Sequence, residues 1–280
     1  MPWSPELFSS PVLERVEERQ RRKPAFIPYF DGLMAGELDA LARSFAVEPE
    51  LHVPLRGRIR GTSALEAYAS ETSSWLQRHN AVVEDVAHVM TERHGFEETV
   101  LHFDSDGESE QIALPVAIVA DHLPNGKLEE LRIYFGNWPL GGGHVNRPPL
   151  LQPDPQLRLS DVVGEYQRAL AAGDIEKIVA AFEPDGYARE PAGGRHVYRG
   201  HNNLRVFYEQ LFSNGGGIPL EHCAAIDDGH SCALEYNAVR WGQSELAPQA
   251  GVAVYVRGPS GRLTAARIYD DVDPPLHAHA

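Results

Sequence analysis

The sequence predicts an α+β fold made of two tandem cone-shaped domains, each with three N-terminal helices packed on a curved, mainly antiparallel sheet. Three observations carry this prediction. The chain has 280 residues, more than the roughly 100 to 200 of one domain. Its two halves repeat one pattern of residues. Within each half, helical spacing comes first and strand-like alternation follows, which is typical of α+β domains.

The repeat is clearest near the start of each half. YFDGLMAGELDALARSF at 29–45 aligns with YQRALAAGDIEKIVAAF at 166–182, at an offset of 137 residues. Later, NGKLEELRIY at 125–134 aligns with SGRLTAARIY at 260–269, at an offset of 135. Solenoid repeats have periods of about 20 to 50 residues, so two copies at this distance indicate a duplicated domain. Duplication favours an intramolecular pseudo-dimer of the two domains, and a further homodimer stays open.

Composition shifts set the expected boundaries. Gly and Pro crowd NWPLGGGHVNRPPLLQPDPQ and remove any periodic pattern there, which indicates a linker. The predicted parts are an N-terminal extension at 1–24 with a short charged helix at 12–22, a first domain at 25–136, a linker at 137–157, a second domain at 158–273 and a tail at 274–280.

Each domain opens with helical spacing. Apolar residues recur at helical intervals in 29–45 and 166–182, and Gly36 and Gly173 break each stretch into two helices. A short β segment follows. A third helix is expected after the cap candidates Gly61-Thr62-Ser63 in the first domain and Gly200 to Asn203 in the second.

Strand patterns fill the rest of each domain. They lie at 82–90, 97–103, 111–122 and 127–135 in the first domain, and at 220–226, 230–239, 250–257 and 262–269 in the second. Three helices followed by such a sheet would enclose an apolar pocket.

Charge and composition exclude several functions. Forty acidic residues outnumber twenty-five basic ones and give a net charge of −15, the opposite of the basic surface that nucleic acids or anionic membranes require. No apolar run approaches the roughly 18 residues of a membrane span. The N-terminus lacks the pattern of a secretory signal, so a cytoplasmic location is expected.

The stretch YQRALAAGDIEKIVAAFEPDGYAREPAGGRHVYRG, from Tyr166 to Gly200, resembles the opening of ketosteroid isomerase and of the wider SnoaL-like, nuclear-transport-factor-two-like superfamily. Both copies resemble it over most of their length. In the isomerase, a carboxylate before Pro-x-Gly is the general base, a tyrosine on the first helix donates to the developing oxyanion, and a late-strand aspartate donates a second bond; the reasoning on tuned carboxylates is taken from this worked case.

Carried over by position, the resemblance assigns the base to Glu190 and the tyrosine donor to Tyr166. Ala253 stands where the late-strand acid is expected, which weakens the case for steroid-type isomerisation. Asp270, in RIYDDVD, is a second candidate acid, and a solvated pair with Asp271 at the strand end is the alternative. Core packing is the alternative for Tyr166.

The duplication supplies an argument that needs no family. Val53 of the first copy aligns with Glu190 of the second. If the valine faces inward, the glutamate does too, and burial would raise its pKa toward the range useful for proton transfer. The alternative is an exposed ion pair with Arg189. Val53, together with Ile118 near the late-strand position, predicts that the first domain is a structural partner that lacks the base. A catalytic role of His52, beside Val53, is the alternative.

Other candidates for substrate contacts are Phe207, Tyr269, Glu235 and Asn237 in the second domain and Tyr29, His52 and His102 in the first. The polar ones among them fit a domain interface equally well, because alternation cannot separate two buried faces. No spacing typical of a metal ligand set or a phosphate loop occurs, so we expect neither a metal nor a cofactor.

We therefore expect a cofactor-independent isomerase, cyclase or epoxide-opening enzyme that acts on an apolar small molecule, with a role in natural-product biosynthesis by analogy alone. The alternative is a non-catalytic module with a duplicated fold that binds a small molecule or a protein.

Overall fold

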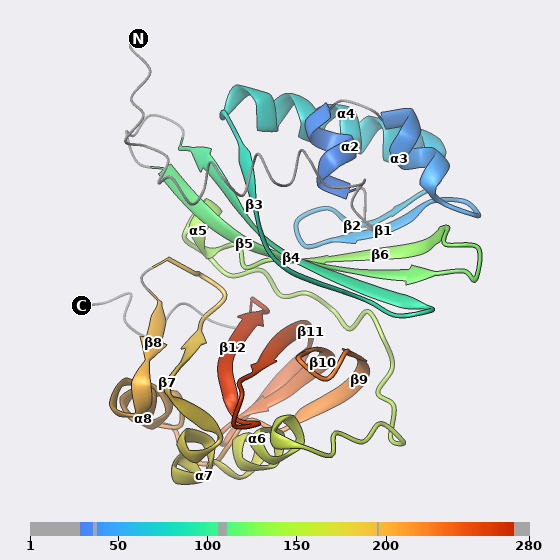
Figure 1. Ribbon diagram of the computed structural model, residues 1–280. Helices are drawn as coiled ribbons and strands as arrows, with labels where there is room; N and C mark the ends of the chain where they lie inside the picture. The colour runs from blue at the N-terminus through green and yellow to red at the C-terminus, as the bar shows by residue number, and fades with distance from the viewer. Residues whose placement is uncertain (1–28, 36–37, 106–110, 195, 272–280) are drawn as a thin grey trace. The chain divides into compact units, whose positions relative to one another are not determined.

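The computed structural model describes residues 29–35, 38–105, 111–194 and 196–271 (Figure 1). The chain forms two compact units. One comprises residues 1–53 and 58–133, and the other comprises 54–57 and 134–280. The expected helix at 12–22 and the tail at 274–280 lie outside the described residues.

The described residues of the first domain form three helices and six strands. The helices are α2 (Tyr29–Ala35), α3 (Leu38–Ser44) and α4 (Thr62–Arg78). The strands are β1 (Glu50–Val53), β2 (Gly57–Arg60), β3 (Val82–Met90), β4 (His94–Asp104), β5 (Gln111–His122) and β6 (Leu128–Tyr134). They form one sheet in the order β2-β1-β6-β5-β4-β3.

The second domain repeats this plan. Its helices are α6 (Val162–Ala172), α7 (Ile175–Ala180) and α8 (Gly200–Leu211). Its strands are β7 (Phe182–Arg189), β8 (Val197–Arg199), β9 (Leu220–Asp227), β10 (Ser231–Trp241), β11 (Ser244–Arg257) and β12 (Leu263–Tyr269). The order β8-β7-β12-β11-β10-β9 is that of the first sheet. The two sheets therefore confirm the predicted α+β fold and its duplication.

Each sheet contains a parallel pair of strands, and the two pairs occupy equivalent positions. β1 pairs with β6 in parallel, as β7 does with β12, whereas the pairs β3–β4, β4–β5, β9–β10, β10–β11 and β11–β12 are antiparallel. After β1 or β7 the chain continues through a short strand and a helix, forms the other strands of the sheet and ends beside the strand where it began. Such a crossover allows the first and last strands to pair in parallel. As a result, the ends of β7 and β12 lie side by side at the same edge.

Local signals explain the first helices of the second domain. The Asp161 carboxylate accepts a hydrogen bond from the Val163 amide and caps α6, which ends at Gly173 in the left-handed conformation with φ 69°. Asp174 caps α7 in the same way. For the third helices, the candidate Gly61 is the N-cap of α4, whereas the N-cap of α8 is Arg199 and none of Gly200 to Asn203; neither cap residue makes a side-chain cap bond.

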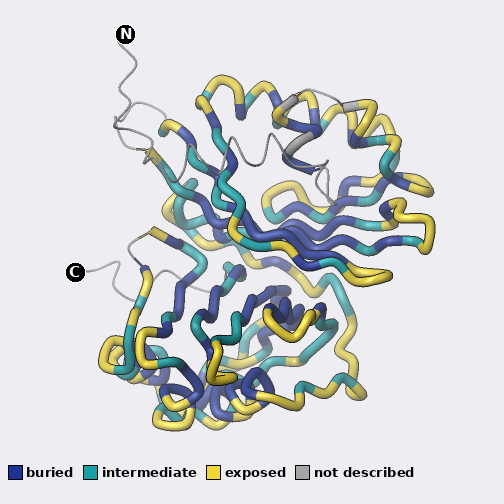
Figure 2. The backbone as a smooth tube through the Cα atoms, in the orientation of Figure 1, coloured by how far each residue is buried: buried dark blue, intermediate teal, exposed yellow. Residues whose placement is uncertain are grey.

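Burial follows the strands and the inner faces of the helices (Figure 2). In the second domain one core cluster joins α6, α7 and α8 to the sheet, and its fully enclosed members include Val163, Phe182, Leu204 and Leu234. β10 is buried on both faces from Ser231 to Ala238, which is why its sequence shows no alternation. Among the described residues, no helix is long and apolar enough to cross a membrane.

A buried ion pair makes the first domain sensitive to acid. Arg132, only 2% exposed, donates to both oxygens of Asp121 at 2.6 and 3.1 Å. Burial alone would raise the pKa of Asp121, but the bond and charge of Arg132 lower it overall.

We predict that this pair stabilises the first domain above pH 4 and that the contribution is lost as the pH falls through the depressed pKa. The folded carboxyl binds its proton less readily than the unfolded one, so the stabilisation needs the ionised form. Amide hydrogen exchange of β5 and β6 between pH 3 and 7 measures it. The Arg132→Met variant should lose this part of the pH dependence, and an unchanged profile in the variant would contradict the assignment.

Candidate functional site

A cavity of about 100 Å³ lies in the second domain between α6, α8 and the inner face of the sheet. Most of its wall is aliphatic or aromatic. The polar groups that enter it come from six residues, which are Glu190, Asp270, Tyr166, Tyr208, Tyr236 and Tyr255. An apolar pocket with a few convergent polar groups is typical of a small-molecule site.

Strand register shows that Glu190 and Val53 occupy equivalent places. Arg189 pairs with Arg267 in the second sheet, and His52 pairs with Arg132 in the first. The next residue along is Glu190 in one sheet and Val53, 4% exposed, in the other. Each follows the same parallel pair, so each turns toward the interior of its own domain.

The Glu190 carboxylate is 9% exposed and has a specific partner. The Tyr198 hydroxyl, from β8, donates to Glu190 Oε1 at 2.5 Å. His196, in the loop between β7 and β8, has its Nδ1 atom 3.9 Å from the same oxygen. Burial, together with the neighbouring carboxylate, raises the pKa of Tyr198, so this phenol stays protonated and donates.

Arg189 does not form the surface pair with Glu190 that was the alternative. Its guanidinium belongs to the opposite side of β7 and lies 4.6 Å from the centre of the Tyr269 ring. Successive residues of a strand point to opposite faces, which separates the two side chains.

Asp270 faces the same cavity from the end of β12. The Tyr236 hydroxyl donates to Asp270 Oδ2 at 2.7 Å. This contact spans β11 at Gly251, which pairs with Tyr236. A Cβ at Gly251 would lie 2.7 Å from the Tyr236 ring and 2.8 Å from the Asp270 Cβ. Only glycine leaves room for the tyrosine and the carboxylate to meet at this point.

Asp271, beside it, is not a solvated partner. Its carboxylate accepts from the backbone amides of Asn137 and Val145, at 3.1 and 2.6 Å, and burial raises its pKa. The residue therefore holds the segment before the second domain, while Asp270 is turned to the cavity.

Tyr166 also lines the cavity. Its hydroxyl forms a 2.8 Å hydrogen bond with that of Tyr208, and burial raises the pKa of Tyr166 to about 12. In such a pair one hydroxyl donates to the other, so one proton of the two remains for a ligand. Phe207, also expected at the site, lines the same cavity and stacks on Tyr198, with 4.3 Å between ring centres.

Three candidates of the second domain do not line this cavity. Glu235 and Asn237 flank Tyr236 on β10 and therefore point to the other face of the sheet. Tyr269 does the same on β12, under Arg189. All three are buried, and the sequence pattern could not assign them a face because β10 and β12 are covered on both sides.

In the first domain, Tyr29 and His102 also have defined partners. The Tyr29 hydroxyl bonds that of Tyr68, from α4, at 2.5 Å, and burial raises the pKa of Tyr29. His102 Nε2 lies 3.0 Å from Glu84 Oε2 on the neighbouring strand. Neither residue contacts a carboxylate equivalent to Glu190, because Val53 stands there.

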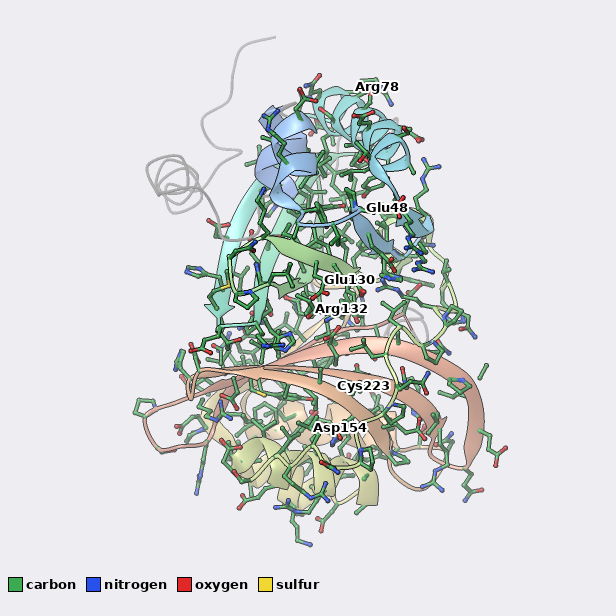
Figure 3. The ribbon with its side chains drawn as sticks, turned by 90° about the vertical axis from the view of Figure 1, so that its right-hand side faces the viewer. Glu48, Arg78, Glu130, Arg132, Asp154 and Cys223 are labelled. Carbon is green, nitrogen blue, oxygen red and sulfur yellow. The ribbon has the colours of Figure 1, made fainter. Side chains whose placement is uncertain are left out.

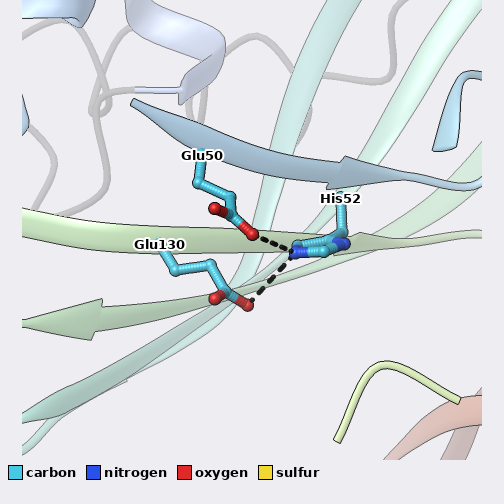
Figure 4. Close-up of side chains that lie close together, drawn as sticks. All are labelled: Glu50, His52 and Glu130. Atoms are coloured by element: carbon cyan, nitrogen blue, oxygen red, sulfur yellow. Dashed lines mark hydrogen bonds and ion pairs between the residues drawn. The ribbon is translucent and has the colours of Figure 1, made fainter. Parts of the chain in front are cut away.

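His52 belongs to a cluster with Glu50 and Glu130 (Figure 4). Its Nε2 lies 3.1 Å from Glu50 Oε1 and 3.6 Å from Glu130 Oε1, and the three ligand atoms lie within 4.8 Å of one another. Such a set could hold a divalent cation.

Arginines already compensate both carboxylates of that cluster. Arg58 donates to both oxygens of Glu50 at 2.7 Å and lowers its pKa. Arg132, two residues from Glu130 on β6 (Figure 3), donates to Glu130 Oε1 at 2.9 Å. A cation would have to compete with these positive charges, so we interpret the cluster as an ion-pair network of the sheet.

Residues 163–266 match the family model described as the SnoaL-like domain. The second domain is a SnoaL-like domain. The match covers the cavity wall from Tyr166 to Tyr255 but ends before Asp270. The first domain shares the strand order of this SnoaL-like domain.

Solved structures with a similar fold include three examples. An NTF2-like protein of unknown function from Cytophaga hutchinsonii is 16% identical over 41% of this chain and 94% of its own, with a TM-score of 0.33. An NTF2-like protein of unknown function from Burkholderia pseudomallei is 22% identical over 39% and 88%, with a TM-score of 0.33. The epoxide hydrolase/cyclase-like enzyme SalBIII, described for pyran ring formation in the polyether salinomycin, is 16% identical over 42% and 92%, with a TM-score of 0.33.

None of these likenesses bears on the activity of the chain. A search of curated proteins found no match. Function therefore has to be argued from the side chains of the SnoaL-like domain itself.

The sequence reasoning missed Tyr198, Tyr208, Tyr236 and Tyr255 at this site. Tyr198 and Tyr236 each donate to a candidate carboxylate. The duplication contained a signal for the first, since Ile59 stands opposite Tyr198 when Gly61 is aligned with Gly200. The second depends on register across three strands, which a single sequence does not give.

Proposed function

We propose that the SnoaL-like domain is a cofactor-independent acid–base enzyme that isomerises, cyclises or opens an epoxide in a compact, mostly apolar molecule. The observation that carries the proposal is a pair of carboxylates, Glu190 and Asp270, in the wall of an otherwise apolar cavity. Two carboxyl groups in one dry site can divide the work of base and acid.

Glu190 is the base in this proposal. Its burial disfavours the charged form, while the hydrogen bond from Tyr198 favours it. The balance suits a carboxylate that takes a proton from a carbon beside a carbonyl or from an attacking hydroxyl or water. Asp270, which accepts from Tyr236 through Oδ2, would have to be protonated to return a proton to the product, and the proton that Glu190 has taken would restore it at the end of the cycle.

Tyr166 and Tyr208 would stabilise the substrate oxygen. A carbonyl becomes an enolate and an epoxide becomes an alkoxide as the reaction proceeds, so negative charge develops on oxygen in both cases. The proton left over in the Tyr166–Tyr208 pair can be donated to that oxygen. The cavity volume, about 100 Å³, limits the buried part of the substrate to about one small ring.

A panel of cyclic enones and small epoxides tests the proposal. We predict that Glu190→Gln lowers kcat/KM at least about a hundredfold on any substrate that the protein turns over, which is the lower range for loss of a general base. Glu209→Gln, an exposed glutamate on α8, is the matched control and should leave kcat/KM unchanged. Equal turnover by Glu190→Gln and the wild type removes the base assignment.

The second candidate is a non-catalytic binding module. It is favoured by Tyr198 and Tyr236, whose hydroxyls donate to Glu190 and Asp270. In that case no member of the panel is turned over, yet apolar ligands still stabilise the fold. A ligand at about a hundred times its Kd should add roughly 2.7 kcal/mol, which a thermal shift assay detects.

A further inference from the structure

Tyr255 stands on β11 in the wall of the cavity, and its hydroxyl is used as an acceptor. Gln167 Nε2, from α6, donates to it at 2.6 Å. Both residues are buried, at 1% and 5% exposure. A phenol that accepts a hydrogen bond still has its own proton to place. In the part of the chain that the structure describes, the Tyr255 hydroxyl has no acceptor for that proton.

His222 fixes the orientation of the Gln167 side-chain amide. His222, on β9, places Nε2 3.2 Å from Gln167 Oε1. A side-chain amide oxygen can only accept, so His222 donates, and the amide nitrogen is turned to Tyr255. Burial lowers the pKa of His222, so the ring is neutral at pH 7 with its proton on Nε2. The three side chains thus form a chain of donors that ends at Tyr255, which lines the cavity.

This chain makes Tyr255 a stronger donor than an isolated buried tyrosine. Donation from an amide to a phenol oxygen polarises the O–H bond, and the effect is larger in a low-dielectric interior. Burial raises the pKa of Tyr255, so the phenol keeps its proton at neutral pH. The ring centres of Tyr255 and Tyr166 lie 5.2 Å apart, so the two phenols are neighbours in the cavity wall.

We infer that Tyr255 donates a hydrogen bond to the oxygen of a bound ketone, ether or epoxide, and that Gln167 is the positioning residue that directs it. The inference rests on the proposed function only for the class of ligand. It assigns the binding of the ligand oxygen to Tyr255 of β11 and Gln167 of α6.

Acetophenone is the probe for this donor. Its carbonyl stretching frequency falls when the oxygen accepts a hydrogen bond, and it can be read in the bound state by infrared difference spectroscopy. We predict a lowered frequency in the wild type, a smaller lowering in Gln167→Leu and the smallest in Tyr255→Phe. Tyr255→Phe should also weaken acetophenone binding about fivefold, as expected for one neutral hydrogen bond.

Two controls separate donation from a structural effect. Tyr236→Phe alters another cavity tyrosine, whose proton is already given to Asp270, and should keep the wild-type carbonyl frequency. Ethylbenzene, which has no oxygen, should bind Tyr255→Phe and the wild type equally. The measurement needs no turnover, so a protein that is inactive on every enone and epoxide can still show the shift.

The inference is overturned if the wild type leaves the carbonyl frequency at its value in an apolar solvent. It is equally overturned if Tyr255→Phe and Tyr236→Phe change the frequency alike, or if ethylbenzene loses affinity in Tyr255→Phe as acetophenone does. A wild-type frequency in Gln167→Leu removes the positioning role.

Discussion

Replacing Gly217 with alanine is expected to destabilise the second domain by about 3 kcal/mol or more, the upper range for forced overpacking. An added Cβ would lie 2.2 Å from the Leu170 carbonyl oxygen, 2.4 Å from the Gly173 nitrogen and 2.6 Å from the Ala171 oxygen. All three atoms are backbone at the end of α6, so no side chain can move aside. The same Leu170 oxygen accepts the Ile218 amide at 2.9 Å, and this bond would be lost.

The consequence reaches the site, because Ile218 lines the cavity. Thermal unfolding of the full chain measures the effect, and a loss of this size should lower the transition of a domain of roughly 100 residues by roughly 10 °C or more. Gly143→Ala is the control. A Cβ there meets only the Gly141 oxygen, at 4.0 Å, and the change should stay within about 0.5 kcal/mol. Equal melting of both variants would show that the end of α6 can shift freely.

The position of Gly217 illustrates what the sequence could not give. Three consecutive glycines at 215–217 predict a loop, and a loop is observed. That the third glycine lies against the end of α6 depends on how the loop returns to β9. Close approach between segments that are distant in the chain leaves no periodic signal, whereas the helices and strands themselves do.

The strands were predicted well because their patterns are long. The expected ranges 82–90 and 111–122 coincide with β3 and β5. β11 begins at Ser244, six residues earlier than predicted, because the polar stretch before Ala250 pairs with β10 without a buried face to mark it. Edges of sheets that meet solvent are the least visible in a sequence.

The candidate site was predictable where the two copies differ. The resemblance suggested Glu190 and Asp270, and the duplication sharpened both, because Val53 aligns with Glu190 and Phe135 with Asp270. Tyr255 was not found, since an aromatic residue on a strand is most often core packing, and its aligned position in the first copy gives no contrast in polarity. What identifies it is the contact with Gln167, which only the fold creates.

The same comparison predicts the effect of moving the carboxylate into the first domain. Val53→Glu should destabilise that domain by about 3 kcal/mol or more, because it buries a charge with no partner. The native valine is 4% exposed, and the opposing Ile59, 9% exposed, cannot donate a hydrogen bond. In the second domain the corresponding pair is Glu190 and Tyr198, joined at 2.5 Å.

Adding Ile59→Tyr to Val53→Glu should therefore recover about 1.5 kcal/mol or more, the net value of a hydrogen bond to a charged group. In Ile59→Tyr alone the phenol has no carboxylate at position 53 to which it can donate. The double-mutant cycle therefore isolates the coupling energy between the two introduced side chains. Amide exchange of β1 and β6 reports it for the first domain.

Burial of the introduced carboxylate determines how the destabilisation by Val53→Glu changes with pH. An unpartnered inward carboxylate has a raised pKa in the folded state, so the destabilisation by Val53→Glu is largest above that pKa and disappears below about pH 4, where the unfolded carboxyl is also protonated. A small loss of stability, equal at pH 4 and pH 8, would mean that this position faces water. The equivalent residue, Glu190, would then be expected to face water as well, and the proposal that it is a general base in the second domain would be wrong.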